Sequence, residues 1–171
     1  MTIVDPQALR NILADLFPAD ALRSDEQRWF HKFWRDFAVA HGRLPGRADF
    51  DPTEMPPSLL PVLMQIDAER PADRPMRFRY RLVGTVTGQF YRRDPTGTYF
   101  EEVYSGEALT HFNSFYTTMA ETRQPDFSEH VRLPWRHEHI LEYSRASFPL
   151  ASDGWTVDRF VLVFHPEYRN R

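Results

Sequence analysis

The chain has 171 residues, of which 42% are hydrophobic, so it can form one well-packed core and we predict a single structural domain. It carries 21 Lys and Arg against 24 Asp and Glu, a net charge of −3, which argues against a protein that binds nucleic acid. It contains no cysteine, which excludes disulfides, thiolate metal sites and chromophores attached through cysteine. No apolar run is long enough to span a membrane, so we expect a cytoplasmic protein without a membrane partner.

Two amphipathic helices are expected near the N-terminus, over residues 5–17 and 24–41. Asp5 offers a cap just before a proline, Ser24 begins a capping box, and Gly42 stands where a helix commonly ends. The apolar stripes of these helices are too wide for one small sheet, so we predict that they form a homodimer interface and act as the output element. The stripe residues are Leu9, Ile12, Leu13, Leu16, Trp29, Phe30, Phe33, Trp34 and Phe37.

From residue 62 onward, apolar residues alternate with polar ones, which is typical of half-buried strands. In the clearest of these segments Phe78, Tyr80 and Leu82 are predicted to face one way and the intervening arginines the other. A helix is expected over residues 107–123, because its apolar residues recur with helical spacing. The predicted strands cover residues 62–67, 77–82, 130–135, 140–148 and 158–165.

Four short motifs occur in order in the middle of the chain. They are LPGR at residues 44–47, DP at 51–52, YRLVGT at 80–85 and DPTG at 94–97. With these motifs the chain resembles the stand-alone PAS-like domain family of alphaproteobacteria, and together with the C-terminal strands the likeness covers residues 29–168. Members of that family look like one-domain sensory or regulatory proteins without an attached catalytic output.

The resemblance implies an α+β fold with a PAS-like five-stranded antiparallel sheet in the order 2-1-5-4-3, helices on one face and an N-terminal helical extension. Residues 1–43 would form the extension and residues 44–171 the PAS-like domain, within one structural domain. The resemblance also implies a non-catalytic sensory module in signal transduction. Such a module binds a small ligand or a regulatory protein partner and signals through its N-terminal helices.

The motif residues also have physical roles that do not depend on the family. Gly84 allows a tight turn after its strand, and the Thr85 hydroxyl can cap the helical turn that follows. Asp94 can bond the backbone of its own turn, which a glycine with positive φ can close. Arg81 can form a charge-assisted bridge to Asp94 or to Glu101. The residues given these structural roles are Arg81, Gly84, Thr85, Asp94 and Gly97.

Aromatic residues come from several segments that would surround the space between the sheet and its helices. Such a space is either a filled core or a ligand pocket, and the sequence leaves both open. A pocket lined with rings and a few hydroxyls would suit a small apolar or aromatic ligand. The candidate pocket residues are Tyr80, Phe90, Tyr91, Phe100, Tyr104, Phe112, Phe115, Tyr116, Trp135 and Tyr143.

Three histidines near the C-terminal strands raise the alternative of a metal-dependent enzyme. His137 and His139 would share one face of a strand, and His130 lies close to them in sequence. Glu138 would point away from them, however, and the HExxH motif is absent. We therefore expect no catalytic residues, no metal ion and no haem, and the identity of any cofactor stays unknown. A ligand-free structural adaptor is the other alternative.

Overall fold

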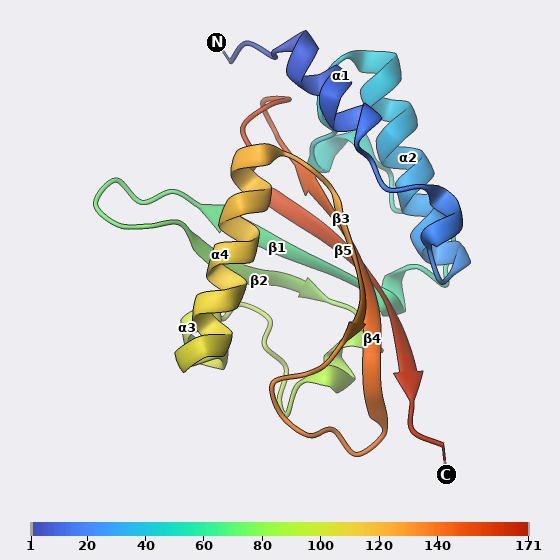
Figure 1. The fold of residues 1–171 in the computed structure, drawn as a ribbon, viewed down its shortest axis with the longest axis vertical. Coiled ribbons are helices and arrows are strands. Elements are labelled where there is room, and N and C mark those ends of the chain that lie inside the picture. The colour runs from blue at the N-terminus through green and yellow to red at the C-terminus, as the bar shows by residue number, and fades with distance from the viewer. Residues whose placement is uncertain (1, 171) are drawn as a thin grey trace.

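A computed structural model describes residues 2–170 of the chain. Its helices are α1 (Pro6–Ala14), α2 (Asp25–His41), α3 (Phe100–Val103) and α4 (Gly106–Thr122). Its strands are β1 (Leu63–Glu69), β2 (Arg77–Val83), β3 (Asp126–Val131), β4 (Ile140–Leu150) and β5 (Arg159–Tyr168). The strands form one antiparallel sheet in the order β2-β1-β5-β4-β3, which confirms the predicted α+β fold and strand order (Figure 1).

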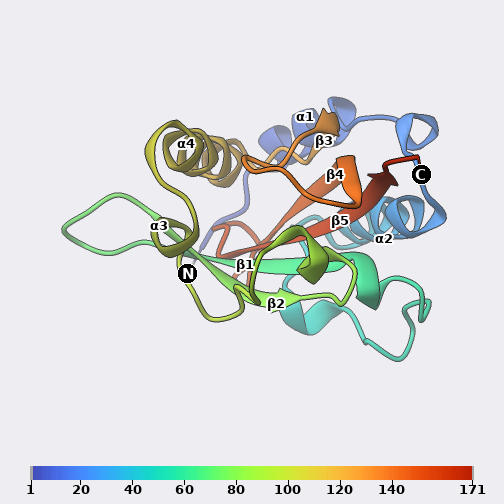
Figure 2. The ribbon, with the colours of Figure 1, turned by 90° about the horizontal axis from the view of Figure 1, so that it is seen from below.

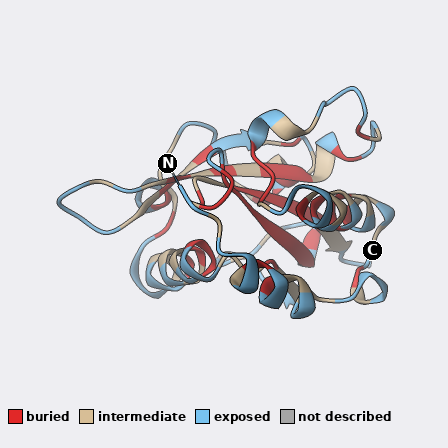
Figure 3. Cartoon of the chain, turned by 90° about the horizontal axis from the view of Figure 1, so that it is seen from above, coloured by how far each residue is buried: buried red, intermediate tan, exposed pale blue. Residues whose placement is uncertain are grey.

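Helices pack on both faces of this sheet (Figure 2). On one face, Tyr116 of α4 packs against Phe160 of β5, with ring centroids 5.3 Å apart. On the other face, Phe30 of α2 packs against Phe148 of β4, with centroids 5.1 Å apart. The N-terminal extension therefore covers the face that α3 and α4 leave free. The sheet lies between the two helical layers and is largely buried (Figure 3).

The two N-terminal helices begin as predicted. Asp5 accepts hydrogen bonds from two backbone N–H groups at the start of α1, and the Ser24 hydroxyl accepts one at the start of α2. Gly42 ends α2 in the left-handed conformation, with a φ of 63°. The first helix is shorter than expected, because it ends at Ala14 and the chain turns before Pro18.

The apolar stripes of these helices pack inside the single chain. Of the predicted interface residues, Leu9, Ile12, Phe30 and Trp34 are buried. The others are half-buried, namely Leu13, Leu16, Trp29, Phe33 and Phe37. The second face of the sheet is thus large enough to cover most of both stripes, and their width does not by itself require a second copy. The homodimer stays a prediction.

The expected orientation of β2 is wrong at Leu82. Phe78 and Tyr80 are buried as predicted, but Leu82 is 37% exposed. The pairing of β1 with β2 shifts between Gln65 and Ile66, so that Ile66 lies opposite Tyr80 while Gln65 lies opposite Leu82. An extra residue of this kind reverses the alternation of side chains along the rest of the strand. Leu82 therefore points away from the core.

The third strand also differs from the prediction of residues 130–135. The strand β3 pairs with β4 from Asp126 onward and ends at Val131. Residues 132–139 form the loop that joins β3 to β4. Pro134 has no N–H group to donate to a sheet, which favours a loop there. Trp135 is consequently a loop residue and not a strand residue.

Of the motif roles, those of Asp94 and Gly97 are confirmed, that of Gly84 changes, and that of Thr85 is wrong. Asp94 bonds the backbone of its own turn at 3.0 Å, and Gly97 has a φ of 84°. Gly84 is required by close packing, since a Cβ at this position would lie 2.3 Å from the carbonyl oxygen of Leu60. Thr85 does not cap the helical turn that follows, because that turn begins two residues later.

Arg81 does not form the predicted bridge to Asp94 or Glu101. Arg77 takes this place, and its Nε donates a hydrogen bond to Glu101 at 2.8 Å. The guanidinium of Arg77 also lies over the ring of Tyr99, 3.6 Å from the ring centroid. Arg77 is therefore held next to the start of α3, which carries Glu101, whereas Arg81 is exposed at the bulge of β2.

Candidate functional site

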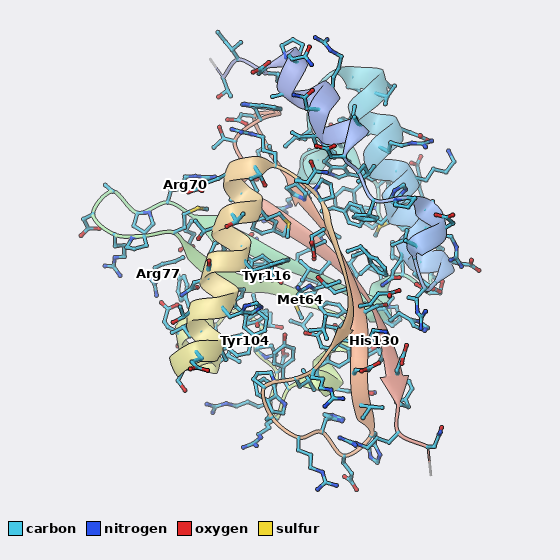
Figure 4. All side chains as sticks on the ribbon, viewed as in Figure 1. Met64, Arg70, Arg77, Tyr104, Tyr116 and His130 are labelled. Atoms are coloured by element: carbon cyan, nitrogen blue, oxygen red, sulfur yellow. The ribbon has the colours of Figure 1, made fainter. Side chains whose placement is uncertain are left out.

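The space between the sheet and helices α3 and α4 is almost completely filled. A cavity of about 10 Å³ remains, which is roughly the room that one water molecule needs. Met64 and Tyr116 reach this layer from β1 and α4, and Tyr104 reaches it from the end of α3 (Figure 4). The lining residues are Met64, Ile66, Tyr80, Tyr91, Phe100, Tyr104, Phe112, Tyr116, Tyr143, Arg145, Leu162 and Phe164. Most of the predicted pocket residues therefore meet around one cavity.

The other three predicted pocket residues do not line the cavity but contact residues that do. Phe90 stacks on Tyr143, with ring centroids 5.0 Å apart. Trp135 stacks on Tyr104 at 5.9 Å and donates a hydrogen bond to the Phe90 carbonyl oxygen at 2.9 Å. Phe115 of α4 is half-buried, and its ring packs against the Arg145 guanidinium. The loop that carries Trp135 thus packs against the aromatic cluster at Tyr104 and Phe90.

Three tyrosine hydroxyls meet in the cavity wall. The Tyr80 and Tyr104 oxygens are 2.7 Å apart, and the Tyr91 oxygen lies 3.3 Å from the first and 3.4 Å from the second. Each neutral hydroxyl can donate one hydrogen bond and can also accept hydrogen bonds. Burial raises the pKa of Tyr104 to about 12, and it raises the pKa of the other two well above their ordinary range. All three hydroxyls therefore stay protonated at neutral pH.

A buried arginine lines the same cavity. Arg145 of β4 is only 4% exposed, yet its Nε atom has no hydrogen-bond partner. Among residues 2–170, no carboxylate oxygen lies within 4.0 Å of its guanidinium group. Its carbon Cζ lies 4.5 Å from the ring centroid of Phe115 and 6.0 Å from that of Tyr116. Contacts with these two rings offset only part of the cost of burying the charge of Arg145, so the guanidinium lacks a full counter-ion.

A second unpartnered polar atom lies on the same strand. Ser147 is completely buried and its Oγ has no hydrogen-bond partner. Alternate residues of a strand share a face, so this hydroxyl belongs to the same layer as Arg145. Asp126 lies opposite Ser147 on β3, and it accepts a hydrogen bond from the Ser128 hydroxyl at 2.6 Å. Its negative charge acts on Arg145 through space, without a direct contact.

A groove of about 910 Å³ runs along α4 and the segment that leads into β3. Phe115 and Met119 line it from α4, and Gln124 and Asp126 line it from the other side. The ring of Phe115 also packs against Arg145. Phe115 therefore lies between the groove and the buried guanidinium.

The strand β4 is a common wall of the cavity and of the layer that contains α2. Arg145 points toward the cavity, and its neighbour Ser144 points toward α2. The side-chain amide of Gln27 in α2 donates hydrogen bonds to the Ser144 hydroxyl at 3.2 Å and to the Val163 carbonyl oxygen at 3.1 Å. A shift of β4 on the cavity side would therefore reach α2 through direct hydrogen bonds.

The structure does not bring the three histidines of the enzyme alternative together as ligands. His137 lies in the β3–β4 loop, where its Nδ1 accepts hydrogen bonds from the backbone N–H groups of His139 and the next residue. Its Nε2 contacts the carbonyl oxygen of Gln89. Both ring nitrogens of His137 are thus engaged by backbone groups. His139 lies beside Glu138, with its Nε2 3.8 Å from a carboxylate oxygen of Glu138.

His130 takes part in a different cluster. Its Nδ1 lies 2.5 Å from a carboxylate oxygen of Glu142, and Glu167 is close by. Within the described range 2–170, this is the one group of three potential metal-binding side chains whose ligand atoms lie within 4.8 Å of one another. Arg23 already donates a hydrogen bond to Glu167 at 3.0 Å. Glu142 raises the pKa of His130, and the histidine in turn lowers the pKa of Glu142.

Arg145, the one charged residue of the cavity wall, is not among the pocket residues predicted from the sequence. A signal for it was present in the alternation of the predicted strand. Tyr143 is a candidate pocket residue, and residues two apart in a strand share a face. Arg145 and Ser147 therefore belong to the pocket side, although a buried arginine is rare enough that a surface position is the ordinary expectation.

The candidate site is the cavity formed by Arg145 and the tyrosines, together with the groove behind Phe115. No helix in the described part of the chain, residues 2–170, has the length and apolar character needed to cross a membrane. Comparison of the chain with protein-family models, with curated proteins and with solved structures found no match.

Proposed function

We propose that the chain is a non-catalytic, PAS-like sensory module that binds a small ligand between its sheet and helices α3 and α4. The four sequence motifs and the strand order support the PAS-like assignment. The absence of cysteine is compatible with the reducing cytoplasm, where we propose that the protein acts.

The placement of buried polar groups around the cavity carries this proposal. A core that serves only stability is best filled with apolar side chains in well-defined rotamers. Here the hydroxyls of Tyr80, Tyr91 and Tyr104 and the guanidinium of Arg145 converge on one small space. An apolar site with a few convergent polar groups is the usual form of a small-molecule pocket.

The size of the cavity implies that binding changes the structure. A space of about 10 Å³ holds no more than roughly one water molecule. A ligand must therefore displace side chains, and the bound state differs from the state described above. A ligand that binds only one of two states shifts the population toward that state, which is what a sensor requires.

Two contacts would carry this change to the N-terminal helices. On β4, Ser144 connects the cavity wall to Gln27 of α2. At the end of α4, the side-chain amide of Gln124 donates a hydrogen bond to the carbonyl oxygen of Ile12 in α1, at 3.1 Å. Gln124 also lines the groove, so opening of the groove would act on α1 directly.

The output would be read by a regulatory protein partner or by a second copy of the chain. Trp29, Phe33 and Phe37 stay half-buried on α2 and offer apolar surface for such a contact. Light scattering of the purified chain measures whether a homodimer forms. A monomer at all accessible concentrations would remove the homodimer from this proposal and leave a protein partner.

Native mass spectrometry of the purified chain, followed by a thermal-shift screen against metabolites, tests the proposal. A ligand that binds only the folded state must raise the melting temperature by mass action. When the hit is added, the largest NMR chemical shift changes of the protein should occur at the cavity residues of β4 and α4. If no small molecule co-purifies and none raises the melting temperature, the structural adaptor is the better description. Stoichiometric zinc or iron that is lost in His137→Ala would instead favour the enzyme.

A further inference from the structure

We infer that the ligand carries a carboxylate group, that Arg145 holds this group, and that the ligand reaches it from the α4 groove by displacing Phe115. This inference rests on the proposed ligand-binding function and adds the chemical class and the route. Four observations support it: the charge balance of the cavity, the protonation of its hydroxyls, the position of Phe115, and the position of Asp126.

The charge balance of the cavity favours an anion. An arginine keeps its positive charge at any pH at which proteins are folded. Arg145 is 4% exposed, its Nε is unpartnered, and within residues 2–170 it has no carboxylate oxygen within 4.0 Å. Elsewhere in the sheet, buried charge is paired: Arg159 donates a hydrogen bond to Asp67 at 2.9 Å. A ligand anion would supply at Arg145 the partner that Arg159 finds within the chain.

The hydroxyls of the cavity favour the same class. The tyrosine hydroxyls stay neutral because burial raises their pKa, so they can donate to an anion without charge repulsion. The planar guanidinium offers two parallel N–H groups, and this geometry matches a carboxylate. The remaining lining is aromatic and aliphatic, as with Phe112 and Leu162, and suits an apolar or aromatic body behind the carboxylate.

Phe115 is placed to control access. Its ring lines the groove of about 910 Å³ on one side and packs on the Arg145 guanidinium at 4.5 Å on the other. Because Phe115 is half-buried, rotation of its side chain toward the groove costs less than movement of a fully buried ring. The Phe115 ring therefore occupies the position beside the Arg145 guanidinium that the carboxylate of a ligand would take.

Asp126 sets how strongly the site attracts an anion. It lines the groove, lies on the pocket face of β3, and contributes negative potential at Arg145. Its carboxylate is held by the Ser128 hydroxyl at 2.6 Å and does not contact the guanidinium. Removal of this charge should strengthen binding of an anion and leave binding of a neutral molecule unchanged. Asp126 is therefore a tuning residue in this proposal.

The test compares carboxylates with amides of the same shape. The probes are acetate, propionate and benzoate, each paired with acetamide, propionamide or benzamide, at millimolar concentration and constant ionic strength. Thermal shift and calorimetry are measured on the full chain and on the variants Arg145→Met, Arg145→Lys and Asp126→Asn. Arg35→Met is the matched control, because Arg35 is an exposed arginine on α2, far from the cavity.

We expect at least one carboxylate to raise the melting temperature while its amide does not. Arg145→Met should weaken its binding by about thirtyfold or more, and Arg145→Lys should weaken it less. Asp126→Asn should strengthen it by up to about tenfold, and Arg35→Met should leave it unchanged. Phe115→Ala should increase the association rate, because it removes the ring that closes the groove.

Two results would overturn this inference and remain distinguishable from failure of the proposed function. If amides bind as well as carboxylates, or if Arg145→Met binds carboxylates normally, the pocket is real but does not select an anion. If no probe binds although the metabolite screen yields a neutral ligand, the carboxylate assignment is wrong and the sensory proposal stands. If neither the probes nor the screen yields a ligand, both proposals fail together.

Discussion

The two faces of the sheet bury residues of the same kinds but treat buried polar groups differently. Beneath α2, the amide of Gln27 donates to two oxygens, and the indole of Trp34 donates to the Pro149 carbonyl oxygen at 2.8 Å. Beneath α4, the Nε of Arg145 and the hydroxyl of Ser147 have no partner. On the face opposite the cavity, the Nε of Arg79 also has no hydrogen-bond partner, but its guanidinium lies 3.4 Å from a carboxylate oxygen of Asp67. The contrast is therefore between a buried cation with a carboxylate partner and one, Arg145, without such a partner among residues 2–170.

This difference is the reason for placing the proposed ligand site on the face beneath α4. Buried polar groups in folded proteins are nearly always satisfied, because an unmade hydrogen bond costs stability. A buried cation that has a carboxylate beside it, as Arg79 has Asp67, is compensated within the chain. Arg145 has no such carboxylate within 4.0 Å among residues 2–170, so an anion from outside would stabilise it most.

The largest expected effect is a difference in the free energy of unfolding that is lost when a ring is removed from each of the two faces. Trp34 is completely buried beneath α2, so Trp34→Ala should lower the free energy of unfolding by about 3–5 kcal/mol. Phe115→Ala, on the half-buried side of α4, should cost only about 1 kcal/mol. Urea denaturation of both variants measures the difference. Equal losses would show that the ring of Phe115 is part of the permanent core.

The next effect should have opposite signs on the two faces. Arg145→Met removes an unpaired buried charge and should raise the free energy of unfolding by about 1–4 kcal/mol. Gln27→Met leaves the Ser144 hydroxyl and a carbonyl oxygen without their donor and should lower it by about 1–3 kcal/mol. Denaturant titration without ligand measures both variants. A strongly destabilised Arg145→Met would mean that this arginine supports the fold.

A smaller effect is expected within the tyrosine cluster. Tyr104→Phe removes the acceptor 2.7 Å from the Tyr80 hydroxyl and should cost about 0.5–1.5 kcal/mol. Tyr168→Phe is the matched control, because Tyr168 is 53% exposed. Thermal denaturation compares the two. If both variants behave alike, the hydrogen bonds among the three hydroxyls contribute nothing to the stability of this face.

The smallest effect concerns His130 and Glu142, at the edge of the sheet. The folded pKa of His130 is raised by Glu142, so its stabilising contribution is present below the ordinary pKa of 6.5 and is lost as pH rises through the raised value. The lowered pKa of Glu142 means that its contribution is present above 4.5 and is lost as pH falls through the lowered value. An NMR titration of Glu142→Gln should return the pKa of His130 toward its ordinary value. An unchanged titration would show that the two side chains do not interact in solution.

Local sequence rules were sufficient for most of the elements. The caps at Asp5 and Ser24 and the left-handed glycine after α2 act within a few residues of chain, so their patterns are visible in the sequence. The orientation of Leu82 was not visible, because a bulge depends on how two strands pair and not on either strand separately. The end of β3 was misplaced although Pro134, which has no N–H group to donate to a sheet, was visible in the sequence.

The aromatic residues of the candidate site could be predicted from the sequence, but the buried charge of Arg145 could not. Aromatic residues such as Tyr80 and Tyr116 cluster because large apolar surfaces gain most from burial, and the sequence marks them clearly. Whether Arg145 is buried, and whether an acid reaches it, depends on the three-dimensional arrangement of β3, β4 and α4. The stripes on α1 and α2 were similarly clear as patterns, while the area available on the second face of the sheet was not.

The alternation of β4 has a consequence for how this protein can be altered. Residues 143, 145 and 147 belong to one layer and residues 144, 146 and 148 to the other, within a single continuous strand. The residues that line the proposed ligand site and the residues that contact α2 thus alternate along one strand. A library restricted to the odd-numbered set should change the lining of the proposed ligand site and leave the packing of α2 intact. A library restricted to the even-numbered set should change how firmly α2 is held and leave that lining intact.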